Sequence, residues 1–262
     1  MISKAIRNLA GTAAAIAVSI ATGQVALAQE ATLKFLHAWD ESAPNTHTIA
    51  FAFAEKVTEA TDGRIAFSFS GPAVVPPGQQ FEPVSAGVFD LNHSTAPYMS
   101  GTSGVPYALL ALKPDAEMWR AKGYWDLVDQ EFQRFNQKLI AYVAESNEAD
   151  AFHIVLKEPL GTGDRPLEGR KIRGNTFYAP MIEPLGASLV NLSGGEIYQA
   201  LERGVVDGAG WGVEGSSQLK LHEVAGYRMT PRFGVLGTYI TMNLNKFNSL
   251  TPADQNVLLE TG

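Results

Sequence analysis

The sequence predicts an α/β protein built of two lobes, and three observations support this prediction. Short apolar segments alternate with amphipathic ones, which is the pattern of strands and helices around a wound sheet. The pattern occurs in two blocks, one on each side of residue 150. An alternating segment over residues 235–244 is long enough to cross from the second block back to the first. We therefore expect two lobes joined by hinge strands, with a ligand cleft between them.

The N-terminal segment has the features of a secretory signal peptide. Lys4 and Arg7 precede an uncharged, mainly apolar run over residues 9–20, and residues 26–28 (Ala-Leu-Ala) supply the small-x-small pattern that signal peptidase recognises. A membrane anchor is the alternative, but it would need about 20 apolar residues. We expect cleavage after Ala28 and a periplasmic mature chain with no inserted segment.

In the first block, the expected order begins strand, helix, strand. Residues 33–36 open as a short strand. Apolar side chains recur at four-residue spacing from Ile49 to Val57 and predict an amphipathic helix that Gly63 closes. Residues 65–69 alternate apolar and polar side chains, as in a strand with one buried face.

The first block continues with the same kinds of element. A turn rich in proline and glycine leads to a short helix over residues 81–86 and a strand over 89–93. Two helical stretches follow over residues 115–138, and residues 139–144 return to a strand.

The second block repeats the alternation of strands and helices. Its expected strands cover residues 152–157, 171–173, 188–192 and 205–209. Ser193 and Glu196 form a capping box that starts the last helix of the block, and Gly204 can end that helix in the left-handed conformation.

These elements define the expected domain boundaries. The first lobe covers residues 29–150, with residues 237–250 returning to it. The second lobe covers residues 151–236, and with it we group residues 251–262 as the start of a C-terminal helix.

Composition and motifs exclude several functions. The chain has no cysteine, which excludes a disulfide scaffold and thiolate metal sites. Its formal charge of −7 makes nucleic acid and anionic membranes poor partners. Residues 101–105 (Gly-Thr-Ser-Gly-Val) fail the hydrolase pattern G-x-S-x-G at the fifth position, and no nucleophile and base pair is visible. We expect no catalytic residues; a periplasmic hydrolase or isomerase is the alternative from another class.

Three segments of the second block carry a family resemblance. Residues 167–173 (Leu-Glu-Gly-Arg-Lys-Ile-Arg) end a strand on a cation, residues 193–201 form the capped helix, and residues 204–208 (Gly-Val-Val-Asp-Gly) lead to the next strand. Their order and spacing resemble the solute-binding proteins of TRAP (tripartite ATP-independent periplasmic) transporters, the DctP-type family. The resemblance extends over most of the mature chain, to residue 250.

The resemblance implies a function as well as a periplasmic-binding-protein-like architecture. Members of this family capture a small organic anion in the periplasm by its carboxylate and deliver it to the small and large TRAP membrane subunits. An ABC-type or sensor-associated periplasmic receptor is the alternative among binding proteins.

Arg173 is the central residue that the resemblance implies. In the family, the arginine of this strand grips the substrate carboxylate. Two physical arguments agree, because open α/β sheets bind ligands at the carboxyl ends of their strands and because the planar guanidinium matches a carboxylate with two hydrogen bonds. The alternative is a solvated surface arginine.

The resemblance also implies eight further ligand contacts. They are His37, Trp39, Ser94, Thr95, Tyr98, Asn175, Phe177 and Trp211. Trp39 and Trp211 stand where sugar-acid receptors have smaller polar residues, which favours a flat or less hydroxylated ligand; core packing is the alternative for both. Gly210 precedes Trp211 where metal-binding members have an acidic residue, so we expect no metal ion and no cofactor.

Overall fold

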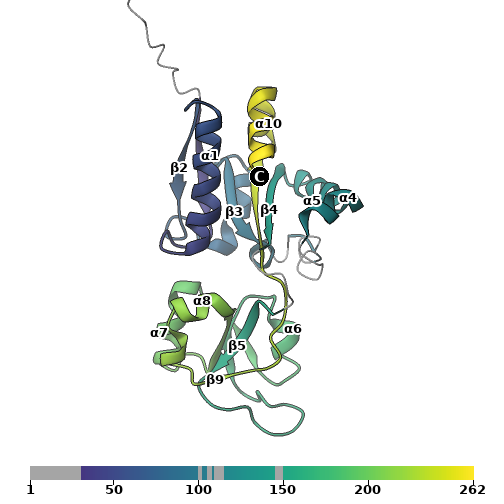
Figure 1. Ribbon diagram of the computed structural model, residues 1–262. Helices are drawn as coiled ribbons and strands as arrows, with labels where there is room; N and C mark the ends of the chain where they lie inside the picture. The colour runs from purple at the N-terminus through teal and green to yellow at the C-terminus, as the bar shows by residue number, and fades with distance from the viewer. Residues whose placement is uncertain (1–30, 100–101, 105–107, 109–114, 145–149) are drawn as a thin grey trace, which may run out of the picture.

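The computed structural model describes residues 31–99, 102–104, 108, 115–144 and 150–262. The expected signal peptide lies outside these residues, as do residues 101 and 105 of the 101–105 segment. Within the described part, the strands form two five-stranded sheets, each with its own helices. Figure 1 shows the two resulting bodies, which confirm the expected two-lobed α/β fold.

The first sheet combines strands from the N-terminal half with one from the C-terminal part. Its strands are β1 (Ala31–His37), β2 (Ile65–Ser70), β3 (Leu91–Thr95), β4 (Gln137–Ala144) and β10 (Gly237–Asn243). Their order is β2-β1-β3-β10-β4, in which β1 pairs in parallel with β2 and β3 while β10 runs antiparallel to β3 and β4. The edge position of β2 explains why Phe69, expected on a buried face, is 36% exposed.

The helix expected from Ile49 onward begins differently from an ordinary α-helix. A π-helical turn, η1 (Thr46–Phe51), leads into α1 (Ala52–Ala60), and Gly63 follows in the left-handed conformation with φ 78°. The four-residue apolar spacing does bury one face, because Phe53 and Val57 pack on the sheet. The π-helical turn was not predicted, since apolar spacing does not distinguish i+4 from i+5 hydrogen bonding.

Helices cover both faces of the first sheet. On the face opposite α1 lie α4 (Ala116–Lys122) and α5 (Tyr124–Gln133), whose Trp119 and Phe132 pack against Leu139 and Tyr239. Other helical segments described in this lobe are η2 (Pro77–Gln79), α2 (Phe81–Ser85), η3 (Ala96–Met99) and α9 (Leu244–Ser249).

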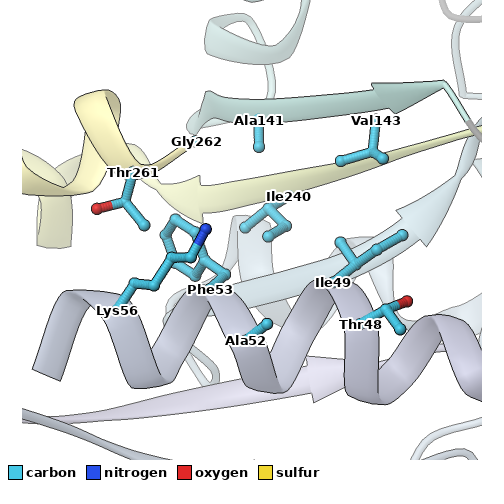
Figure 2. A pocket seen from close by; sticks show the side chains of 10 residues that line it. All are labelled: Thr48, Ile49, Ala52, Phe53, Lys56, Ala141, Val143, Ile240, Thr261 and Gly262. Atoms are coloured by element: carbon cyan, nitrogen blue, oxygen red, sulfur yellow. The ribbon is translucent and has the colours of Figure 1, made fainter.

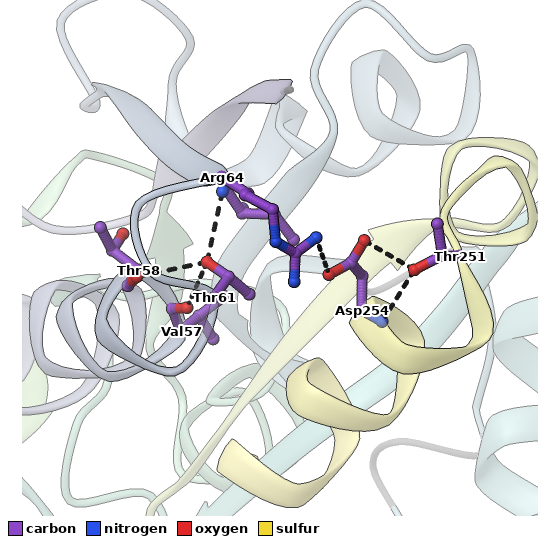
Figure 3. A network of polar contacts seen from close by, with 7 residues as sticks. Val57, Thr58, Thr61, Arg64, Thr251 and Asp254 are labelled. Carbon is purple, nitrogen blue, oxygen red and sulfur yellow. Dashed lines mark hydrogen bonds and ion pairs between the residues drawn. The ribbon is translucent and has the colours of Figure 1, made fainter. Parts of the chain in front are cut away.

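The C-terminal helix, α10 (Pro252–Thr261), corrects one domain assignment. Grouping residues 251–262 with the second lobe is wrong, because Leu258 joins the core beside α1. Asp254 also pairs with Arg64 at 2.8 Å, and its backbone N–H is capped by the Thr251 hydroxyl (Figure 3). The helix thus packs on the first lobe.

The second sheet holds the strand that ends on Arg173. Its strands are β5 (Phe152–Leu156), β6 (Lys171–Arg173), β7 (Ser188–Val190), β8 (Gly208–Gly212) and β9 (Tyr227–Arg228). Their order is β7-β6-β8-β5-β9, in which β6 is parallel to β7 and β8. The helical segments are α6 (Ala179–Ile182), η4 (Gly194–Glu196), α7 (Ile197–Glu202), α8 (Val213–Gln218) and η5 (Leu221–Glu223).

Local sequence signals predicted most of the helix ends and strands of this lobe. The capping box exists, with the Ser193 N–H donating to Glu196 Oε2 at 2.9 Å, and Gly204 has φ 70°. The strand expected over residues 205–209 begins three residues later, at Gly208. The reason is a tight connection, because the Lys171 N–H donates to the Asp207 carboxylate at 2.8 Å.

Two chain segments between the lobes run side by side where they enter the second lobe. The Ala151 N–H donates to Gly234 O at 3.0 Å, and Phe152 and Phe233 exchange two backbone hydrogen bonds of 2.9 and 3.0 Å. Nowhere in the described part of the chain does a helix combine the length and the apolar character needed to cross a membrane.

Candidate ligand-binding site

Arg173 lies at the carboxyl end of β6 and is only 2% exposed. Its Nε donates to Leu192 O at 2.9 Å, one terminal nitrogen donates to the same carbonyl at 2.7 Å, and the other donates to Gly210 O at 2.9 Å. These bonds use three of the five guanidinium N–H groups and fix the plane of the side chain. Two N–H groups are left without a partner among the described residues.

The charge of Arg173 is not balanced as the other buried charges are. Apart from histidines, the buried charged side chains in the described part of the chain are Asp129, Asp254 and Arg173. Asp129 pairs with Lys138 at 2.5 Å and Asp254 with Arg64 at 2.8 Å. No described carboxylate lies within 4.0 Å of the Arg173 guanidinium. Burial lowers the pKa of Arg173, but an arginine remains charged at neutral pH.

Trp211 covers the guanidinium from β8. The centroid of its indole lies 4.9 Å from Arg173 Cζ, a cation–π distance. Two glycines make room for the indole, because a Cβ on Gly194 would lie 2.6 Å from its Cη2 and a Cβ on Gly215 would lie 2.5 Å from its Nε1. The aromatic ring is therefore held in place by the start of η4 and by α8.

Tyr178 completes the surroundings of Arg173 and was not predicted. Its ring lies against β8 so closely that a Cβ on Gly210 would be 2.4 Å from Tyr178 Cε1. Burial raises the pKa of the Tyr178 hydroxyl, and the charge of Arg173 opposes this effect. The signal in the sequence is the alternation Gly-Ala-Gly-Trp-Gly over residues 208–212, which marks a close approach to the backbone.

Side chains of the first lobe reach the same region. Tyr98, in η3, has a pKa that burial raises and that the charge of Arg173 lowers, so these two residues from different lobes interact electrostatically. The Tyr98 ring lies 6.0 Å from that of Trp39, and Trp39 lies 5.1 Å from His93. A row of aromatic rings thus leads away from Arg173 into the first lobe.

His37, the last residue of β1, and His93, in the middle of β3, are both buried and are paired in the register of the two strands. His37 Nδ1 donates to Trp39 O at 2.6 Å, whereas its Nε2 and both ring nitrogens of His93 have no hydrogen-bond partner among the described residues. Burial, together with the neighbouring His37, lowers the pKa of His93 to about 3. His93 is therefore neutral at neutral pH. Its place in a predicted strand was the one local signal for its burial.

The other predicted contacts are spread around this region. Ser94 and Thr95 belong to β3, which extends two residues beyond the expected end at residue 93, and the Thr95 hydroxyl donates to Gly237 O at 2.8 Å. Asn175 Oδ1 accepts a hydrogen bond from the Phe177 N–H at 3.1 Å. The Phe177 ring lies 5.4 Å from Phe152, in the aromatic core of the second lobe. The structure thus gathers Arg173, Trp211, Tyr98 and Trp39, while Thr95 and Phe177 make contacts within their own lobes.

Two hollows lie on the first lobe, apart from these residues. Figure 2 shows the one between α1 and strands β4 and β10, which is lined by Thr48, Ile49, Ala52, Phe53, Lys56, Ala141, Val143, Ile240, Thr261 and Gly262. It contains none of the predicted ligand contacts. In the described part of the chain, no group of three or more His, Cys, Asp and Glu residues has the arrangement of a metal site.

Comparison with known proteins gives matches over most of the chain. The sequence profile described as bacterial extracellular solute-binding protein, family 7 (DctP), matches residues 35–261. A monocarboxylate 2-oxoacid-binding periplasmic protein of Nostoc sp. is 29% identical over 215 residues, which cover 78% of this chain. The match covers 58% of that relative, less than two thirds of its length.

Solved structures share the fold. A TRAP periplasmic solute-binding protein from Roseobacter denitrificans with bound β-D-glucuronate has a TM-score of 0.75 and 21% identity, covering 88% of this chain and 78% of its own. An extracytoplasmic solute receptor of Bordetella pertussis that binds pyroglutamic acid has a TM-score of 0.76 and 16% identity, covering 88% of this chain and 77% of its own. At these identities the likeness is one of fold.

Proposed function

Because the chain belongs to the bacterial extracellular solute-binding proteins of family 7, we propose that it is the periplasmic receptor of a TRAP transporter. In this role it captures a small organic acid by its carboxylate and delivers it to the membrane subunits. Carboxylate ligands in two proteins of the same fold, glucuronate and pyroglutamic acid, support the choice of ligand class.

The observation that carries the proposal is the unbalanced charge of Arg173. A buried charge is costly unless it is paired and hydrogen-bonded, and both buried aspartates have such a partner. Arg173 has two backbone carbonyls, an aromatic face and two N–H groups to spare. A ligand carboxylate supplies the missing negative charge and accepts those two N–H groups in a bidentate pair.

Aromatic side chains of both lobes strengthen the pairing of the ligand carboxylate with Arg173. Trp211 comes from the lobe that carries Arg173, and Tyr98 and Trp39 come from the other. When the lobes close on a ligand, these rings exclude water, which strengthens the charge interaction and favours the closed state. The closed form is then the one that the membrane subunits recognise.

The proposal is tested by titration calorimetry of the mature protein with a library of carboxylic acids. A true ligand also raises thermal stability by RT ln(1 + [L]/Kd), about 2.7 kcal/mol at a hundredfold excess over Kd. Arg173→Gln should weaken binding of the ligand found by about 30- to 5,000-fold, since removing one partner of a buried charge pair costs about 2–5 kcal/mol.

Matched variants separate loss of binding from loss of fold. Arg203→Gln removes an exposed arginine of the same lobe and should leave affinity unchanged. Arg173→Lys keeps the charge but loses the planar fork, so it should also bind weakly. A fully folded Arg173→Gln protein that binds within threefold of the unmodified one would refute the role of this residue.

A further inference from the structure

The charge of the ligand can be inferred from the cations available to it. Among the lysines and arginines that the structure describes, Arg173 is the one that is buried. The other cations with named partners are engaged elsewhere, as Arg64 is with Asp254 and Lys138 with Asp129. The carbonyls that hold Arg173 are neutral. The site therefore offers a bound ligand one positive charge.

The other described residues of the second lobe beside Arg173 add no cation. Burial raises the pKa of Tyr178, so its hydroxyl stays protonated at neutral pH. Trp211 is uncharged. The charge of Glu196 also acts on Arg173, and this exposed carboxylate is held by Ser193. A second negative group directed toward η4 would therefore meet a like charge.

The described residues of the first lobe that line this region, Trp39, His93 and Tyr98, include no lysine or arginine. Tyr98 and Trp39 carry no charge at neutral pH, and the pKa of His93 is about 3. The two residues that follow Trp39 are acids, Asp40 and Glu41, and both are exposed. A negative group at this end of the ligand would have uncharged rings beside it, and the chain directly after Trp39 adds two more negative charges.

We propose that the ligand carries a single carboxylate and that its remaining part has no negative charge. This inference rests on the proposed function and narrows it from organic acids to monocarboxylates. The carboxylate occupies Arg173, and the uncharged part extends along Trp39 and Tyr98. A dicarboxylate would bury a second charge with no partner, which typically costs enough to lower affinity at least about thirtyfold.

Isosteric ligand pairs test the inference directly. Each pair consists of a dicarboxylate and its monoamide, which has nearly the same shape and one negative charge fewer. Suitable pairs are succinate and succinamate, glutarate and glutaramate, adipate and adipamate, and terephthalate and 4-carbamoylbenzoate. Calorimetry at pH 7.5 and constant ionic strength gives the affinity of each member for the mature protein.

The expected result is that, in every pair with measurable binding, the monoamide binds at least about thirtyfold more tightly than the diacid. A diacid that binds as tightly as its monoamide, or more tightly, overturns the inference while leaving the proposed function intact. If the protein binds no monocarboxylate or dicarboxylate at all, the proposed function fails, and the inference fails with it.

Discussion

The burial of His93 predicts a specific loss of stability in acid. Its pKa of about 3 in the folded protein lies below the ordinary value of 6.5, so the unfolded chain binds a proton at pH values where the folded protein does not. Stability therefore falls as the pH falls below about 6.5 and stops falling near pH 3. For this single group, lowering the pH from 7.5 to 5 should reduce the free energy of unfolding by about 2 kcal/mol.

Urea unfolding at the two pH values measures this effect. His93→Gln removes the titrating group, so its own loss of stability between pH 7.5 and pH 5 should be smaller than that of the unmodified protein by about 2 kcal/mol. His222→Gln removes an exposed histidine and should leave the loss unchanged. Equal losses in the His93→Gln protein and the unmodified protein would show that His93 does not resist protonation, and the reasoning from its burial would be refuted.

Three further predictions concern contacts around the site and the C-terminal helix. Trp211→Ala should weaken ligand binding by about tenfold or more, measured by calorimetry, because it removes the ring over the guanidinium; unchanged affinity would make that ring a packing residue only. Gly210→Ala should lower stability by about 1–3 kcal/mol in urea unfolding, since its methyl group would overlap Tyr178, and a neutral result would contradict the close approach. Asp254→Asn should lower the free energy of unfolding by about 1–2 kcal/mol in the same assay, because Arg64 loses its charged partner. Salt screens ion pairs, so a loss of stability seen at high salt but not at low salt would contradict this pairing.

Most elements of the fold were predictable because their signals are local. The capping box at Ser193 is complete within four residues, and helix α1 is predicted by the spacing of its own apolar side chains. The start of β8 was expected three residues too early because it is set by a tertiary contact, the hydrogen bond from the Lys171 N–H to the Asp207 carboxylate. Residues 208–212 are mostly glycine and alanine, so they also show no alternation of apolar and polar side chains that would mark this strand.

The candidate site was only partly predictable. Arg173 was found because a motif at the end of a strand marks it, but its hydrogen-bond acceptors lie 19 and 37 residues further along the chain. Tyr178 lies near Arg173 because its ring packs on the backbone of Gly210 in β8, a tertiary contact that no local pattern specifies. The lobe against which α10 packs was also not predictable from local sequence, because tertiary contacts such as that between Arg64 and Asp254 determine it.

The hydrogen bonds of Arg173 fix its orientation in the fold but leave its charge for the proposed ligand. Three hydrogen bonds to backbone carbonyls satisfy part of the guanidinium without neutralising it. Its orientation is thus fixed before a ligand arrives, and little conformational entropy is lost on binding. A carboxylate of the protein in the same place would have stabilised the fold and blocked the ligand. Because no described carboxylate pairs with this charge, the free energy of pairing would be available to the proposed ligand and, through it, to the proposed closure of the lobes.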